Sequence, residues 1–214
     1  MDSTPAHPDE SLSRREREKA AHRQEILDAA VRVFARRGFS AATLDEIAEE
    51  AEFSKGALYL YFPSKEDLLF NVLFDLANVV LRGFKTSLRG EKSFRRELAD
   101  LYTGAAEFSF THRDELKIAM SLHMAFMSGL SEEAHLKMFN IHEEIVNVLR
   151  ERTRKALADG ELRDVPIDGV AWMIHGSINS IAMTRWECET PEELKKASVA
   201  FIDILFGGIE KKKE

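Results

Sequence analysis

Two helix-start signals lie close together within residues 43–65 (TLDEIAEEAEFSKGALYLYFPSK). Thr43 followed by Glu46 forms a capping box, in which each side chain bonds the backbone amide of the other residue. Ser54 is a second N-cap, and the helix that it opens must end before Pro63, because the residue before a proline disfavours helical geometry. Two short helices joined so closely fit a helix-turn-helix, whose second helix can enter the major groove of DNA.

The second of these helices carries a surface suited to nucleic acid. No acidic residue occurs from Phe53 to Lys65. Carboxylates are unfavourable beside phosphates, whereas lysine ammonium groups and tyrosine hydroxyls are not. The acidic residues of the first helix are expected to lie away from this surface; they are Asp45, Glu46, Glu49 and Glu50. For either tyrosine alone, half-buried packing is the simpler interpretation, but the whole arrangement favours DNA binding.

Residues 22–73 resemble the DNA-binding domain of the TetR/AcrR family of bacterial transcriptional regulators. The matching pieces are ILDAAVRVFARRGFSAATLDEIAEEA and SKGALYLYFPSKEDLL. The resemblance implies an all-α homodimer. In it, the three N-terminal helices of each chain would bind DNA, and the C-terminal helices would bind a ligand and dimerise.

The resemblance also implies roles for individual residues at the DNA surface. Those expected to face bases are Lys55, Gly56 and Tyr59. Those expected to hold phosphates are Thr43, Tyr61 and Lys65. Ala57 belongs to the same surface, but relatives often carry threonine or serine there, so one hydroxyl contact to the DNA backbone is expected to be missing.

The turn between the two short helices departs from the family pattern. Most relatives have glycine where this chain has Glu52. If the position requires a positive φ, glutamate adopts it at some energetic cost. We expect the turn to survive, slightly strained or slightly reshaped.

Composition limits the classes of protein that this chain can be. Its 214 residues are 44% hydrophobic and 31% charged, which is ordinary for a globular protein. The formal net charge of −7 argues against nucleic-acid binding over the whole surface, but not against a local site. Cys188 is the only cysteine, so a reducing cytoplasm fits best. Neither a signal peptide nor an apolar run long enough to span a membrane is present, so no membrane partner is expected.

Caps and breakers predict the organisation of the chain. We expect a disordered arm at residues 1–20, a helix-turn-helix DNA-binding domain at 21–66, and a helical ligand-binding and dimerisation domain at 67–214. Besides the two short helices, helices are expected at residues 22–37, 64–85, 94–111, 114–128, 131–159, 167–186 and from 190 onwards. The expected fold is therefore all-α, with about nine helices.

The last two helices carry periodic apolar faces. On the first the face comprises Val170, Ile174, Ile178 and Ile181; on the second it comprises Leu194, Ala197, Phe201, Ile204 and Leu205. In the family, these helices form a four-helix interface between subunits. Periodicity alone shows only that such faces are buried, within one chain or between two. A homodimer is favoured because one short reading helix makes few contacts, and a symmetric pair on a palindromic operator supplies the missing affinity.

Methionine and aromatic side chains are concentrated in the C-terminal part of the chain. Methionine adapts to irregular shapes and is common at promiscuous apolar sites. The sequence therefore suggests a pocket for a hydrophobic effector, such as an acyl chain or an aromatic compound; a plain helical core is the simpler alternative for each residue. The candidate effector-binding residues are Phe108, Met120, His123, Met124, Met127, Trp172, His175 and Asn179.

Two classes of function are consistent with these features. The first is a ligand-responsive regulator, expected to be a cytoplasmic repressor that binds a palindromic operator on double-stranded DNA. The alternatives are a helical enzyme, a purely structural helical protein that happens to contain a helix-turn-helix pattern, or a regulator that senses a metal through its C-terminal histidines. An enzyme would need a nucleophile, metal or phosphate-binding motif. No GxSxG, Walker-type loop or HExxH occurs, so no catalytic residue, cofactor or metal is expected.

Overall fold

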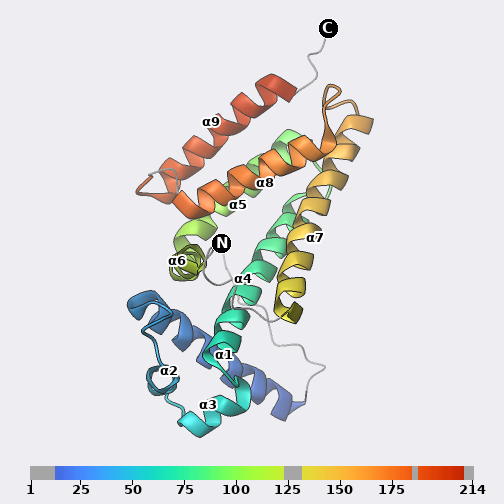
Figure 1. Cartoon of the computed structure of the whole chain (residues 1–214). Coiled ribbons are helices and arrows are strands. Elements are labelled where there is room, and N and C mark those ends of the chain that lie inside the picture. Colours follow the sequence, from blue (N-terminus) through green and yellow to red (C-terminus); the bar gives the residue numbers. More distant parts are fainter. Residues whose placement is uncertain (1–12, 123–131, 185–187, 210–214) are drawn as a thin grey trace. The chain divides into compact units, whose positions relative to one another are not determined.

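Helices make up most of the part of the chain that the structure describes (Figure 1). The structure is a computed structural model that describes residues 13–122, 132–184 and 188–209. Within these ranges it contains nine helices and no strand, which confirms the predicted all-α class. The chain divides into two compact units between Val72 and Leu73, inside one helix. Among the helices described, none combines the length and hydropathy that crossing a membrane requires.

The first unit consists of three helices and the beginning of a fourth. These are α1 (Arg14–Arg37), α2 (Leu44–Glu50), α3 (Lys55–Tyr61) and α4 (Lys65–Ser87), the last of which continues into the second unit. Buried side chains from all of them form one core: Ile26, Ala30, Val33, Phe34, Ile47, Ala48, Leu58, Phe62, Leu68 and Leu69. Both N-caps predicted for the short helices are present, because the Thr43 and Ser54 side chains accept hydrogen bonds from the amides of Glu46 and Ala57.

Helix α1 starts earlier than the sequence predicted. It begins at Arg14, so the expected disordered arm at residues 1–20 is wrong for residues 14–20. Ser13 and Glu16 form a capping box, in which the Ser13 amide donates to the Glu16 carboxylate over 2.8 Å. This first part of the helix is exposed all round. Apolar periodicity therefore gave no signal for it, although the local capping motif did.

The turn between α2 and α3 has the backbone geometry suspected from the sequence. Glu52 has φ 60°, the one positive φ of a non-glycine residue in the part described. Its amide donates to the Glu49 carbonyl over 3.1 Å, and the Phe53 amide donates to the Ala48 carbonyl over 2.9 Å. This pair of bonds is a Schellman motif, which requires a left-handed residue just after the helix. The positive φ suspected at Glu52 is therefore confirmed, and the turn survives without glycine.

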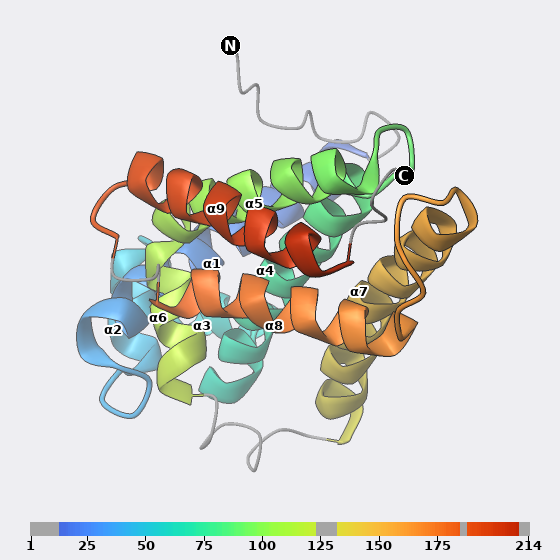
Figure 2. The same ribbon diagram turned by 90° about the horizontal axis from the view of Figure 1, so that it is seen from above.

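The second unit contains the rest of α4 and five further helices (Figure 2). They are α5 (Phe94–Thr111), α6 (Arg113–Leu122), α7 (Glu132–Ala158), α8 (Ile167–Thr184) and α9 (Pro191–Ile209). Their starts agree with the predicted helices to within a residue, because each start carries a local cap or breaker. The predicted ends of the helices at 114–128 and 167–186 lie outside the described residues.

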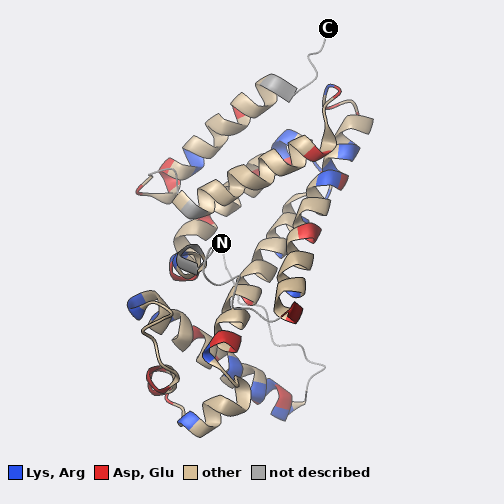
Figure 3. Cartoon of the chain, viewed as in Figure 1, with Lys and Arg blue, Asp and Glu red and all other residues tan. Residues whose placement is uncertain are grey.

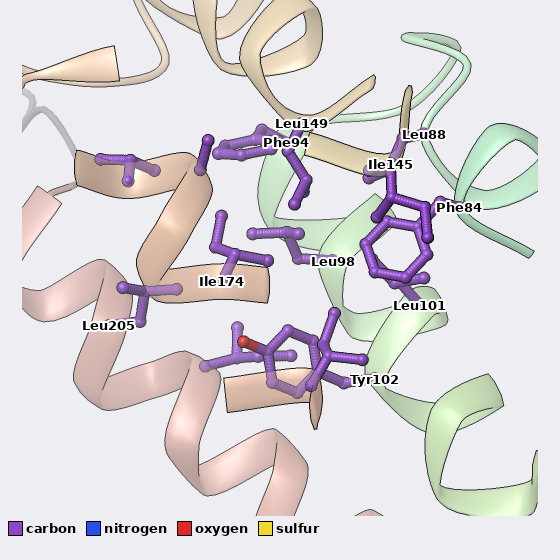
Figure 4. Close-up of a cluster of buried hydrophobic side chains, with 14 of the residues drawn as sticks. Phe84, Leu88, Phe94, Leu98, Leu101, Tyr102, Ile145, Leu149, Ile174 and Leu205 are labelled. Carbon is purple, nitrogen blue, oxygen red and sulfur yellow. The ribbon is translucent and has the colours of Figure 1, made fainter. Parts of the chain in front are cut away.

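A single apolar core fills the second unit, and α5 lies at its centre. Helices α8 and α9 both pack against α5 (Figure 2). The core includes Phe84, Phe94, Leu98, Leu101, Tyr102, Ile145, Leu149, Ile174 and Leu205 (Figure 4). The predicted apolar face of α8 belongs to this core, so it is buried within one chain. On α9, Leu194 and Leu205 are buried, whereas Ile204 is 76% exposed.

A buried ion pair joins α5 to α7 within this core. The Arg152 guanidinium donates to the Glu97 carboxylate over 2.5 Å, and both side chains are almost fully buried. Arg152 also donates to the Lys92 carbonyl and to Glu161, and its guanidinium lies 5.0 Å from the centre of the Phe94 ring. The other Glu97 oxygen accepts the amides of residues 91 and 92. The pair therefore fixes the loop before α5 and the turn after α7 to the core.

We predict that Glu52→Gly stabilises the first unit. Glycine adopts a positive φ without the clash that costs other residues about 1–2 kcal/mol, so the expected gain is about 1 kcal/mol after the extra chain entropy of glycine is included. Urea unfolding followed by circular dichroism would measure it. Glu49→Gly is the matched control: it places glycine in a helical position of α2, where it should destabilise the protein. A loss of stability in both variants would contradict the proposed strain.

Candidate functional site

A shallow hollow of about 290 Å³ lies on the first unit, between the starts of α2 and α4 and the exposed side of α3. Its lining consists of Ala42, Thr43, Leu44, Asp45, Lys55, Tyr59 and Lys65. The structure thus brings together four of the seven residues predicted for the DNA surface, from three different elements. The remaining three, Gly56, Ala57 and Tyr61, lie on α3.

Helix α3 presents one exposed side. Lys55, Gly56 and Tyr59 are exposed, whereas Leu58 is completely buried. A Cβ at position 56 would meet no atom within 4 Å, so the backbone there is open to an approaching ligand. Leu60 is 84% exposed on the same helix, and the sequence analysis missed it. Its exposure follows from the short helix, which leaves no neighbouring element to cover this position.

The two other hydroxyl-bearing residues of the predicted surface are held by protein contacts. The Thr43 hydroxyl donates to the Glu46 carboxylate over 3.1 Å, and Glu46 in turn accepts two hydrogen bonds from Arg37. The Arg37 guanidinium and the Thr43 groups lower the pKa of the Glu46 carboxyl. The Tyr61 hydroxyl lies 3.3 Å from Nδ1 of His22. Tyr61 is also half-buried.

An acidic side chain lies beside the predicted reading helix. The Lys55 ammonium is 2.7 Å and 2.9 Å from the two carboxylate oxygens of Asp45. This contact raises the pKa of Lys55 through the hydrogen bond and the charge of Asp45. The expectation that the acids of α2 lie away from α3 is therefore wrong for Asp45. In Figure 3, the ribbon of α3 itself carries no acidic residue.

The lysine predicted to bind a phosphate instead donates its hydrogen bonds to backbone carbonyls of the protein. The Lys65 ammonium donates to the carbonyls of Phe39 and Ala42 over 2.8 Å each, and to that of Ser40 over 3.3 Å. It also lies 4.6 Å from the centre of the Phe39 ring. An ammonium group has three N–H donors, and these carbonyls use all of them. Lys65 thus fixes the segment between α1 and α2 and leaves no donor for a phosphate.

The predicted effector residues form only one contact group in the described part of the second unit. On α8, the Trp172 and His175 rings lie 5.7 Å apart at 89°, and Asn179 contacts His175. His142 of α7 joins them, with its ring 4.6 Å from that of His175. Phe108 instead stacks on His112 at the end of α5. His123, Met124 and Met127 lie outside the described residues, as does the side chain of Met120.

His175 has a strongly shifted pKa. Only 6% of its surface is exposed, and burial, followed by the nearby His142, lowers its pKa from the ordinary 6.5 to about 4. The imidazole is therefore neutral at physiological pH. Within the described ranges, no three possible ligands from His, Cys, Asp and Glu gather around a point that could hold a metal.

Comparison with known proteins identifies the family. Residues 26–72, which include α2 and α3, match the sequence profile described as "Bacterial regulatory proteins, tetR family". The chain belongs to the TetR/AcrR family. These regulators bind DNA through a helix-turn-helix, so the hollow and the exposed side of α3 lie in the family's DNA-binding domain.

Other family members extend the similarity over nearly the whole chain. The fatty acid metabolism regulator protein of Bacillus subtilis is 25% identical over 92% of this chain and 100% of its own length. The transcriptional repressor KstR2 of Mycolicibacterium smegmatis is 27% identical over 89% of this chain and 91% of its own length. The structure of FadR from Bacillus subtilis in complex with stearoyl-CoA has the same fold, with a TM-score of 0.69, 22% identity, and coverage of 87% of this chain and 99% of that one.

We predict that Lys65→Met destabilises the first unit by about 1.5–3 kcal/mol, because three carbonyls lose a charged donor. Faster hydrogen exchange at the amides of residues 42–47 would locate the effect at the start of α2. Lys65→Arg should restore only part of the loss, because a planar guanidinium does not direct its donors at three converging carbonyls. If Lys65→Met left the stability unchanged and weakened the salt dependence of DNA binding, Lys65 would contact a phosphate, as the sequence predicted.

We predict that His175 makes the stability of the second unit depend on pH. Its folded pKa of about 4 lies below the unfolded value of 6.5, so the unfolded chain binds a proton first as pH falls. The stabilisation is complete above pH 6.5, and about 2–3 kcal/mol is lost on acidification to pH 4. Urea titrations at several pH values should show a steeper loss for the wild type than for His175→Gln. Parallel pH profiles would contradict the assignment.

Proposed function

We propose that this protein is a transcriptional repressor that binds a palindromic operator as a homodimer and is released by a fatty acyl-CoA. The observation that carries the proposal is the exposed side of α3, where Lys55, Gly56 and Tyr59 lie beside the hollow at the start of α2. This surface lies within the segment that matches the tetR-family profile.

In this proposal, α3 reads bases in the major groove. The Lys55 ammonium donates to guanine O6 and N7, and Gly56 allows the groove edge to approach closely. The Tyr59 hydroxyl donates to or accepts from a base edge. Leu60, which projects from the same helix, makes apolar contact with a thymine methyl group.

The residues around α3 position the protein on the DNA backbone. The Thr43 and Tyr61 hydroxyls contact phosphates after exchanging their protein partners, Glu46 and His22. Ala57 offers only a methyl group at this surface. Lys65 contributes by fixing the segment that carries Thr43, and its positive charge adds to the attraction of the backbone.

The homodimer is proposed to form through the sides of α8 and α9 that face away from α5. Their inner sides are already buried within one chain. Large apolar side chains are exposed on both helices: Trp172 and Met173 on α8, and Val199 and Ile204 on α9. Glycines at 176 and 207 are exposed on the same helices and would allow close approach of a second copy.

The effector is proposed from the relatives and from the composition of the second unit. The FadR structure named above holds stearoyl-CoA, and its fold covers most of this chain. Of the predicted effector residues, Trp172, His175 and Asn179 of α8 lie together and would offer an effector an aromatic ring, a neutral imidazole and an amide. Helix α4 belongs to both units, so a shift of α4 on effector binding would change the spacing of the two reading helices.

Operator selection from a random duplex library tests the proposed function. We expect one palindromic sequence to be enriched, and binding by fluorescence anisotropy to weaken steeply with salt, at a slope of about −0.9 per phosphate contact. Lys55→Ala should reduce the preference for that sequence by about tenfold, the effect of losing one bidentate base contact. Lys85→Ala removes the same charge from the second unit and should leave the preference unchanged.

The same assay tests the effector. Stearoyl-CoA should release the selected duplex at concentrations where free coenzyme A and stearate do not. Size-exclusion chromatography with light scattering should give a dimer, and Ile204→Glu should shift it towards a monomer. A wild-type protein that binds no duplex, or one that binds without sequence preference, would contradict the proposed function.

A further inference from the structure

We propose that Asp45 is a specificity-determining residue that competes with DNA for the Lys55 ammonium and so suppresses binding to non-operator sequences. The inference rests on the proposed function, in which α3 reads the major groove. Its basis is the contact of Lys55 with both Asp45 oxygens, at 2.7 Å and 2.9 Å, inside the hollow at the start of α2. Both side chains are more than half exposed, at 56% for Lys55 and 64% for Asp45, so DNA can reach them.

Asp45 does not belong to the capping box that opens its helix. The α2 capping box consists of Thr43 and Glu46, and Arg37 holds Glu46 in place. The Asp45–Lys55 pair is exposed, and exposed ion pairs contribute little to stability. The pair therefore has its main effect on the charge that the hollow presents to a ligand.

The Asp45–Lys55 ion pair makes the first contact with any DNA duplex less favourable, whatever its sequence. A phosphate that approaches Lys55 also approaches the Asp45 carboxylate, and its attraction to the ammonium is cancelled in part by the repulsion. Lys55 must leave Asp45 before it can donate to DNA. On random sequence nothing offsets the loss of the ion pair, so non-specific binding is weakened.

The operator can offset this loss in a way that random sequence cannot. A guanine offers Lys55 two acceptors, O6 and N7, in place of the two carboxylate oxygens. A neighbouring cytosine offers its N4 amino group to the freed Asp45 carboxylate. The proposal therefore predicts a G·C pair at the operator position that faces Lys55 and Asp45.

Asp45→Asn tests the proposal, with dissociation constants measured for the selected duplex and for a mixed-sequence duplex of equal length. The freed lysine should add one phosphate contact on the mixed-sequence duplex. At about 0.1 M salt this strengthens binding about fivefold to tenfold and steepens the salt slope by about one. Affinity for the selected duplex should change less than twofold to threefold, about the size of a modest exposed charge effect, so the specificity ratio falls.

Two further variants separate the proposed contact from a general effect of charge. Glu49→Gln removes the same charge one turn along α2 and should leave the ratio unchanged. In a Lys55→Ala background, Asp45→Asn should give no gain beyond that of Glu49→Gln, because its partner is gone. The midpoint of thermal unfolding, measured for each variant, establishes that every variant is folded.

The outcomes distinguish this inference from the proposed function. If the wild type binds the selected duplex with sequence preference and Asp45→Asn leaves the specificity ratio and salt slope unchanged, the inference is wrong and the proposed function stands. An equal gain from Asp45→Asn and Glu49→Gln would also overturn it. If the wild type binds neither duplex, the proposed function and the inference fail together.

Discussion

The position of α2 depends on one lysine, because the carbonyls of residues 39, 40 and 42 converge on the ammonium of Lys65. Ala42 precedes the capping residue Thr43, so the same contact sets where α2 begins. Glu46 and Arg37 then hold the Thr43 amide and hydroxyl from the other side. The candidate interface is therefore ordered within the first unit before any ligand arrives, which reduces the entropy that binding must overcome.

Charge has opposite roles in the two units. In the second unit, Arg152 and Glu97 are buried together, and each forms hydrogen bonds with several partners. A buried charge that lost its partner would be strongly unfavourable, so this pair fixes the loops at the ends of α5 and α7. In the first unit, Lys55 and Asp45 are exposed and their contact is weak. A weak contact can be exchanged for a ligand, whereas the buried one cannot.

The helix boundaries followed from the sequence wherever a cap or a breaker was local. Thr43, Ser54 and Thr190 opened helices as predicted, and the strain at Glu52 could be inferred because the turn demands a particular φ. The exposed start of α1 lay outside the predicted helix bounds because those bounds relied on apolar periodicity, which an all-exposed helix does not show. The apolar sides of α8 and α9 were visible as periodic faces. Their burial against α5 within one chain needed the fold, because periodicity does not identify the partner surface.

The sequence was enough to predict the all-α class, the helix-turn-helix and the exposure of Lys55, Gly56 and Tyr59 on α3, because these depend on hydrogen bonds and spacing within a few residues. Tertiary structure alone decided the partners of the charged residues. It placed Asp45 against Lys55 and turned Lys65 towards the backbone of residues 39–42. These contacts join residues from different helices. No local rule reports them, because the direction of a long flexible side chain depends on what the fold brings within its reach.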